Sequence, residues 1–307
     1  MRLMTTLGPL EVDALGSILP HEHVVADLRP LDEREPPSEH RVEDIVNLTV
    51  REVRAAQAAG VTAIVDATPV GVGRRPDAVE ALSAATGMPF AMATGIYREP
   101  WIPDWVKASS STELTDWMLR ELEDHIDGAT SPAAWIKVSA GDDGLTSEEE
   151  RVLRAAAHAS RVTGCAIGSH TIRADVVETQ LGVLESEGFP IERFVWIHTQ
   201  LEPDFDRHLA LADRGVWVEY DGIGTSPRLE EYVQMVGGMV AAGHADRLLL
   251  SQDSGWYDAG NPQGGLARGP YTAVHTEFLP LLRERGFDDA LIGQLTKDNP
   301  FRAFARP

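Results

Sequence analysis

Residues 164–188, GCAIGSHTIRADVVETQLGVLESEG, contain one complete structural unit of this chain. The short apolar run that ends at His170 predicts a strand over Ala166–His170. In the segment that follows, Ala174–Glu187, apolar residues recur at the spacing of an amphipathic helix. Gly188 then stands where a glycine commonly ends a helix. A strand, a helix and a closing glycine are the pattern from which we derive the fold.

The same alternation runs along the whole chain. The expected strands are Ser17–His21, Thr62–Ala67, Phe90–Ile96, Ala134–Ser139, Ala166–His170, Phe194–His198, Val216–Tyr220 and Arg247–Ser251. Amphipathic segments lie between them, among them Val42–Ala59, Glu113–Ile126, Ser147–Thr163 and Leu229–Ala242. Thr146 and Glu149 have the spacing of a capping box at the start of one of these helices. Eight strand-then-helix units predict an α/β fold, a single (β/α)8 TIM barrel with a closed parallel sheet.

The length of the chain is compatible with two average domains or with one large barrel. Its 307 residues contain no low-complexity tract and no linker rich in proline, glycine or serine. We therefore expect one domain over residues 1–307. The opening stretch Thr5–Asp13, around Gly8-Pro9, is predicted to form a short β-hairpin that caps the floor of the barrel.

Composition limits the partners and the compartment. The formal net charge of −21 argues against nucleic acid or an anionic membrane as a partner. The single cysteine, Cys165, excludes an internal disulfide, and its apolar surroundings predict a buried thiol rather than a nucleophile. The chain has no apolar run of about 18 residues and no apolar signal core after Met1. We expect a cytoplasmic protein that acts on a small molecule.

Polar side chains gather where the predicted strands end. Since the active sites of (β/α)8 barrels lie at the C-terminal ends of the strands, these side chains should meet on one face. His21 and His23 stand two residues apart on an extended segment, so both imidazoles point to the same side and can reach one metal ion. Singly, such histidines fit structural hydrogen bonding and such aspartates fit helix caps. The full set is His21, His23, Asp66, Tyr97, Lys137, His170, His198, Asp221 and Asp253.

Lys137 stands out because it lies in an apolar strand and the chain has only three lysines. Burial lowers the pKa of an ammonium group, which makes the neutral amine accessible. A neutral amine reacts with carbon dioxide to give a carbamate, whose oxygens can bridge two metal ions. The alternative is a lysine paired with a nearby carboxylate, and Lys137 taken alone favours this pair.

Together these segments resemble the phosphotriesterase family of the amidohydrolase superfamily. The resemblance covers essentially the whole chain and rests on Gly8-Pro9, Leu19–His23, Ala93–Tyr97, Ile136–Val138, Gly168–Thr171, Trp196–Thr199, Ser251–Asp253 and Asn299-Pro300. It implies a homodimer and a binuclear metal centre, usually of zinc. It also implies that His21, His23 and Asp253 hold the buried metal and that His170 and His198 hold the exposed one. N-carboxylated Lys137 and a hydroxide would bridge the two.

The resemblance also implies roles in catalysis. The bridging hydroxide would attack the substrate, and Asp253 would accept its proton and pass it to the leaving group. Tyr97 resembles a family tyrosine that orients the substrate, although a core or rim aromatic fits equally well. Trp256, in the glycine-rich loop after Asp253, either forms an aromatic wall of the pocket or packs the loop down. Two arginines just past strand ends, Arg98 and Arg173, either bind an anionic group or pair with surface acids.

One departure from the family bears on the substrate. Asp221 is followed by Gly222, where organophosphate-degrading members carry a histidine and quorum-quenching lactonases carry an arginine-tyrosine pair. This departure argues against both specialities as the main activity. Because the ligand set is complete and a metal-bridging hydroxide suits a trigonal carbonyl carbon, we expect a hydrolase of a lactone or other carboxylic ester, with weak promiscuous phosphotriesterase activity. The alternative is an amide hydrolase in which Asp253 protonates the departing nitrogen. A non-catalytic small-molecule-binding barrel is disfavoured, because every ligand position is occupied.

Overall fold

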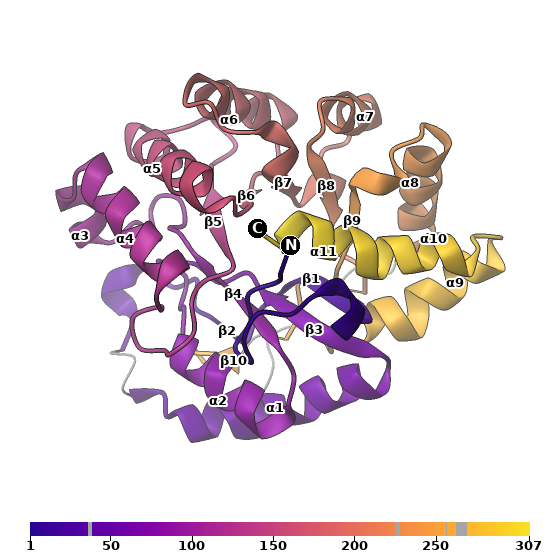
Figure 1. Ribbon diagram of the computed structural model, residues 1–307, viewed down its shortest axis with the longest axis horizontal. Coiled ribbons are helices and arrows are strands. Elements are labelled where there is room, and N and C mark those ends of the chain that lie inside the picture. Colours follow the sequence, from indigo (N-terminus) through magenta and orange to yellow (C-terminus); the bar gives the residue numbers. More distant parts are fainter. Residues whose placement is uncertain (36–38, 225–227, 256, 262–268) are drawn as a thin grey trace.

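The computed structural model describes residues 1–35, 39–224, 228–255, 257–261 and 269–307. Eight parallel strands follow one another around a barrel in chain order, as Figure 1 shows. They are β1 (Ser17–Glu22), β3 (Val61–Asp66), β4 (Phe90–Thr94), β5 (Trp135–Ser139), β6 (Ile167–His170), β7 (Phe194–Ile197), β8 (Trp217–Tyr220) and β9 (Leu248–Leu250). The predicted (β/α)8 barrel is confirmed.

The first and last strands meet and leave the barrel nearly closed. The backbone N–H of Asp253 donates to the carbonyl of His21 at 3.2 Å. The backbone N–H of His21 donates in turn to the Ser251 hydroxyl at 3.0 Å. Closure thus brings the segment after β9 directly against the histidines of β1.

Helices surround the barrel on its outside (Figure 1). Ser110 caps α4 in a capping box with Glu113, so this helix begins two residues before the expected Glu113. The predicted box of Thr146 and Glu149 is present at the start of α5. The helices are α1 (Val42–Ala58), α2 (Pro76–Thr86), α3 (Asp104–Ala108), α4 (Ser111–Glu123), α5 (Ser147–Thr163), α6 (Ala174–Ser186), α7 (Phe205–Asp213), α8 (Leu229–Ala241), α9 (Leu279–Glu284), α10 (Asp289–Gly293) and α11 (Asn299–Phe304).

The core has two layers. One cluster of buried apolar side chains fills the space between strands and helices, and a second fills the inside of the barrel. Small residues such as Ala63, Ala91 and Ala134 line the inside, and Phe301 and Phe304 of α11 close it from below. Because apolar side chains fill the lower barrel, polar chemistry is confined to the opposite end.

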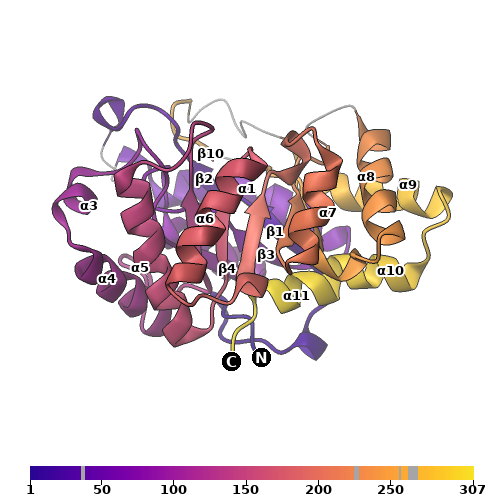
Figure 2. The ribbon, with the colours of Figure 1, turned by 90° about the horizontal axis from the view of Figure 1, so that it is seen from above.

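The floor of the barrel carries both chain termini, and Figure 2 shows them side by side near α11. The expected hairpin over Thr5–Asp13 is shorter and starts earlier, with one antiparallel bridge between Leu3 and Leu10. The reason is local, since Val12–Ala14 turns into a 3-10 helix and cannot continue a strand. No helix in the described part of the chain is long and apolar enough to cross a membrane.

A two-stranded sheet that the sequence did not indicate lies at the opposite end from the termini (Figure 2). Its strands are β2 (Val25–Ala26) and β10 (Tyr257–Asp258), which pair in parallel. This pairing ties the segment after His23 to the segment after Asp253. It therefore fixes the two loops on one side of the candidate site.

Candidate metal centre and its pocket

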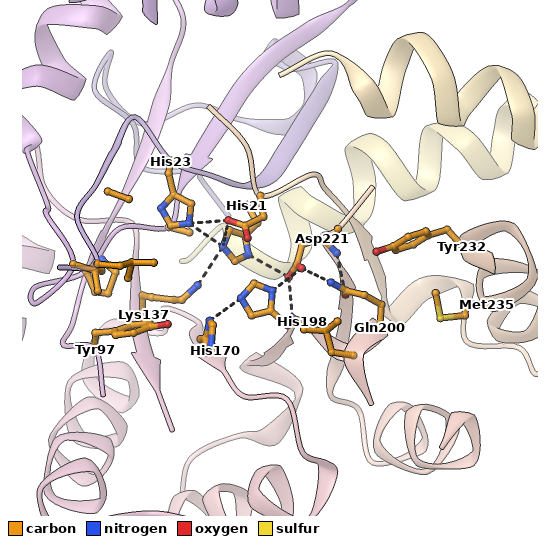
Figure 3. Close-up of a pocket in the computed structure, with 18 of the residues that line it drawn as sticks. His21, His23, Tyr97, Lys137, His170, His198, Gln200, Asp221, Tyr232 and Met235 are labelled. Carbon is orange, nitrogen blue, oxygen red and sulfur yellow. Dashed lines mark hydrogen bonds and ion pairs between the residues drawn. The ribbon is translucent and has the colours of Figure 1, made fainter. Parts of the chain in front are cut away.

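The structure brings all six predicted metal ligands to the C-terminal end of the barrel, where they line one cavity of about 400 Å³ (Figure 3). Each residue reaches this end from its own strand, except that β1 supplies two. The six are His21 in β1, His23 just after it, Lys137 in β5, His170 at the end of β6, His198 after β7 and Asp253 after β9.

Three of these residues have the spacing of ligands around one metal ion. The Nε2 atoms of His21 and His23 are 3.3 Å apart, and Asp253 Oδ1 lies 3.1 Å from His23 Nε2 and 3.7 Å from His21 Nε2. Ligand atoms at 2.0–2.1 Å from a tetrahedral zinc ion are separated by about 3.3 Å. Two imidazoles and a carboxylate are also ligands that zinc prefers. The residues therefore fit a divalent metal ion.

Other protein groups orient the imidazoles of His21 and His23 toward the candidate metal position. His21 Nδ1 lies 2.6 Å from Glu219 Oε1 and 3.4 Å from Asp221 Oδ2, and His23 Nδ1 lies 2.7 Å from the Thr68 hydroxyl. Each ring thus uses Nδ1 to bond to the protein and presents Nε2 to the cavity. Such outer partners fix the ring orientation of metal-binding histidines.

The second pair of histidines is held in a similar way. His170 Nδ1 lies 2.7 Å from His198 Nε2. Asp221 fixes His198 twice, because its carboxylate lies 2.7 Å from the ring Nδ1 and accepts the backbone N–H at 2.8 Å. Gln200 donates to the same carboxylate at 2.7 Å. His170 and His198 therefore face each other with their inner nitrogens in the cavity.

Lys137 is only 2 % exposed, and its Nζ lies 3.4 Å from His21 Nε2. Burial lowers the pKa of the ammonium group, against the opposing effect of nearby acids such as Glu219 and Asp253. Within the part of the chain that the structure describes, no carboxylate is within ion-pair distance of Nζ. The geometry therefore favours a neutral amine over the lysine–carboxylate pair that Lys137 taken alone suggested.

The protonation states of the cluster suit metal binding. Burial lowers the pKa of His21 to about 3, so the imidazole is neutral at neutral pH. Burial alone would raise the pKa of Asp253, but the hydrogen bond with His23 and the charges of His21 and His198 lower it to about 2. Metal ions bind neutral imidazoles and ionised carboxylates, so neither ligand has to lose a proton first.

Two candidate ligands sit in strained backbone. His198 has φ 66° and Asp253 has φ 50°, and they are the non-glycine residues with positive φ in the described ranges. Such conformations cost on the order of 1–3 kcal/mol each and are concentrated at functional sites. Surrounding contacts must therefore hold these two side chains in place.

Glu22, between the two histidines of β1, provides such contacts for Asp253. Its carboxylate is fully buried and accepts the backbone N–H of Ser254 at 2.7 Å and that of Gln252 at 3.3 Å. It also accepts the Ser251 hydroxyl at 2.8 Å. The carboxylate thus binds the chain on both sides of Asp253.

Of the other residues singled out from the sequence, Tyr97 lines the cavity, with its ring edge-on to His170 at 5.3 Å. Asp66 instead accepts the backbone N–H groups of Val24 and Thr68 at 2.9 and 3.1 Å and has a structural role.

The two arginines do not line the cavity. The guanidinium of Arg98 lies over the rings of Trp101 and Tyr97, at 5.4 and 5.9 Å from their centroids. Arg173 is exposed and lies 3.6 Å from Asp175, as expected of an arginine that pairs with a surface acid. Trp256 lies outside the described residues.

Sequence reasoning missed several residues of the site. Glu219 carried a usable signal, because a charged residue inside the buried strand β8 stands two positions before Asp221 and so shares its side. Other missed residues that line the cavity or support its ligands include Glu22, Thr68, Gln200, Leu201, Arg228, Tyr232 and Met235.

The fold and the site define a (β/α)8-barrel protein with a candidate metal centre at the C-terminal ends of its strands. The chain belongs to the Phosphotriesterase family, which residues 1–304 match. This finding confirms the resemblance drawn from the sequence.

Two curated relatives span nearly the same length. A phosphotriesterase homology protein from Mycobacterium tuberculosis is 28 % identical, over 99 % of this chain and 98 % of its own. An N-acetyltaurine hydrolase from Rattus norvegicus is 27 % identical, over 97 % of this chain and 96 % of its own.

Two solved structures share the fold. A triple mutant of an organophosphorus hydrolase from Deinococcus radiodurans superposes with a TM-score of 0.88 at 29 % identity, covering 99 % of this chain and 98 % of that one. A lactonase from Listeria monocytogenes superposes with a TM-score of 0.87 at 24 % identity, with 100 % of both chains covered. The named activities of these relatives are hydrolytic.

Proposed function

We propose that this protein is a metal-dependent hydrolase that cleaves lactones or other carboxylic esters, with weak phosphotriesterase activity as a side reaction. The observation that carries the proposal is the convergence of four histidines, Asp253 and a buried lysine at the base of one cavity. Membership of the Phosphotriesterase family supports hydrolysis as the reaction class.

His21, His23 and Asp253 would hold one divalent metal ion, and His170 and His198 a second. Lys137 would lie between them as a carbamate, since its amine is buried next to His21. We propose zinc because the donors are imidazole and carboxylate. When bound, the two ions would acidify a water molecule and polarise the scissile carbonyl.

The chain's own residues would bind the substrate and move the proton. Asp253 is ionised at neutral pH, since its pKa is lowered to about 2 despite burial, so it can accept a proton and pass it to the leaving oxygen. Burial raises the pKa of Tyr97, and its phenol therefore remains a hydrogen-bond donor beside His170. Tyr97 would orient the ester in the cavity.

Much of the remaining wall is apolar. Leu28, Val72, Leu201 and Met235 line the cavity, and Arg228 and Glu231 supply its other charged side chains. Apolar walls with a few converging polar groups are typical of pockets that bind small organic molecules. An ester or lactone with an apolar substituent matches this distribution.

Amide hydrolysis is the second candidate. The rat relative is named for the hydrolysis of an N-acyl compound, and Arg228 lines the cavity here. An amide whose amine part carries an acidic group would place that group near this guanidinium, which also pairs with Glu231 at 3.3 Å. In this reaction Asp253 would protonate the departing nitrogen.

A substrate screen tests the proposal. Zinc-loaded protein is assayed on matched lactones, aryl esters, N-acyl amides and phosphotriesters. We expect the highest kcat/KM on a lactone or ester, and its loss in His21→Ala. Activity confined to amides would establish the second candidate, and His21→Ala with unchanged activity would contradict a metal-dependent reaction.

The homodimer and the cytoplasmic location stay predictions. The mass of the purified protein in solution, measured by light scattering, tests the first. Fractionation of the source cells tests the second.

A further inference from the structure

The cavity extends from the polar cluster toward α8. In Figure 3, Gln200, Tyr232 and Met235 lie on the far side of Asp221 from Lys137 and Tyr97. Gly222 and Leu201 also line this part of the cavity. We call the part lined by Gln200, Leu201, Gly222, Tyr232 and Met235 the α8 arm.

Gly222 makes room for a tyrosine hydroxyl. A Cβ atom at residue 222 would lie 2.3 Å from Tyr232 Oη and 3.2 Å from Gln200 Nε2. The backbone of Gly222 is not in the left-handed region, so space rather than conformation requires glycine. The Tyr232 hydroxyl thus takes the place of the side chain that Gly222 lacks.

This hydroxyl is placed to meet a substrate. The Tyr232 side chain comes from α8, and its ring packs edge-on against Phe278 at 6.3 Å, while the residue as a whole is only 6 % exposed. No hydrogen bond to the hydroxyl is found among the described residues. Because Tyr232 lines the cavity, its hydroxyl can donate a hydrogen bond to a ligand bound there.

The rest of the arm indicates what that ligand carries. Leu201 and Met235 are apolar and offer no hydrogen bonds of consequence. The Gln200 amide is already used, because its Nε2 donates to Asp221 Oδ1 at 2.7 Å and its Oε1 accepts the Asp221 backbone N–H at 3.2 Å. Burial raises the pKa of Tyr232, which keeps its hydroxyl protonated. The arm therefore offers one donor next to apolar Leu201 and Met235. Arg228 and Glu231, which pair with each other at 3.3 Å, also line the cavity.

We propose that the α8 arm is a specificity subsite in which the Tyr232 hydroxyl binds an oxygen atom carried on an otherwise apolar substituent of the substrate. The selected substrates are esters or lactones whose side chain bears a hydroxyl or carbonyl group. This inference rests on the proposed ester hydrolase function and adds a preference that the metal ligands do not specify.

A matched substrate pair tests the subsite. The first probe is a γ-butyrolactone with a hexyl chain on its γ carbon. The others are isomers of this lactone, each with one hydroxyl at a different position of the hexyl chain. Tyr232→Phe should lower kcat/KM by about tenfold for the best hydroxylated isomer, the effect of one hydrogen bond. It should change kcat/KM for the plain lactone by less than about twofold. Equal losses on both, or none on either, would overturn the subsite.

Gly222→Ala provides an independent variant. Its new Cβ displaces the Tyr232 hydroxyl, so the preference for the hydroxylated lactone should fall as in Tyr232→Phe. In the double variant the ring remains, with Cζ 3.5 Å from the new Cβ, which is ordinary contact. Gln200 Nε2, 3.2 Å from the new Cβ, has to shift by a few tenths of an ångström, so the double variant should show the same lost preference as Tyr232→Phe and no further loss of preference. A Gly222→Ala protein that keeps the full preference would contradict the proposal.

Binding without turnover separates the subsite from the proposed reaction. The corresponding hexyl cyclopentanones, with and without the chain hydroxyl, cannot be hydrolysed, and calorimetry measures their binding to the zinc-loaded protein. We expect the wild type to bind the hydroxylated ketone about tenfold more tightly and Tyr232→Phe to lose this difference. This result would support the subsite even if no lactone were hydrolysed. A wild type without preference would overturn it.

Discussion

The carboxylate of Glu22 binds the backbone on both sides of Asp253, at 2.7 Å to the N–H of Ser254 and 3.3 Å to that of Gln252. Asp253 itself has φ 50°, a conformation that its neighbours must maintain. The residue between the two histidines of β1 therefore positions the carboxylate that completes their ligand set.

Replacing Glu22 should weaken metal binding. In Glu22→Met the side chain keeps its approximate length but offers no acceptor, and the released N–H groups no longer hold Asp253 in place. We expect the affinity for the first zinc ion to fall about 10–100-fold, as is typical when an outer partner of a ligand is lost. Competition with a chromophoric chelator measures this affinity.

Two controls accompany this experiment. Glu22→Gln retains one carbonyl oxygen for Ser254 and should lose less affinity than Glu22→Met. Glu11→Gln changes an exposed acid and should bind zinc like the wild type. A Glu22→Met protein with wild-type affinity would show that Glu22 does not position Asp253.

Added carboxylate should restore activity to a variant that lacks the Lys137 side chain. In Lys137→Ala, activity should fall by more than about 100-fold, since even outer partners of metal ligands contribute 10–100-fold. Formate, acetate or propionate should restore part of it by occupying the place of the carbamate. Lys137→Met fills the same space and should not be restored. Equal responses of the two variants to carboxylate would rule out the bridging role.

His275 should make stability dependent on pH. Its Nε2 lies 2.7 Å from the Ser17 hydroxyl, its buried Nδ1 has no partner among the described residues, and burial lowers its pKa from 6.5 to about 4. The unfolded chain therefore binds the proton more readily, and stability present above pH 6.5 is lost as the pH falls toward 4. At pH 5 the loss is about 2 kcal/mol.

Urea unfolding of wild type and His275→Gln at pH 7 and pH 5 checks this prediction. The glutamine cannot titrate, so the free energy of unfolding of the wild type should drop by about 2 kcal/mol more than that of the variant. Equal drops in the two proteins would contradict the assignment.

The sequence predicted the barrel and the ligand positions for physical reasons. Strands of a parallel sheet are buried on both faces, so they appear as short, continuous apolar runs. A histidine or lysine such as His170 or Lys137 at the end of such a run is conspicuous. Chain order then places each on the same face of the barrel.

The supporting residues could not be predicted in this way. Glu22 acts on residues that are about 230 positions away in the chain, and this contact exists only because β1 and β9 meet. Tyr232 belongs to a helix whose apolar spacing gives no sign that its hydroxyl reaches Gly222. Only the tertiary structure shows these partners.

The metal content of the purified protein tests the central claim most directly. The protein is loaded with zinc, dialysed against metal-free buffer and analysed for elemental content, beside the double variant His170→Ala/His198→Ala. The account predicts two zinc ions per chain in the wild type and one in the double variant. A wild type that retains no zinc, or a double variant that still retains two ions, would contradict it.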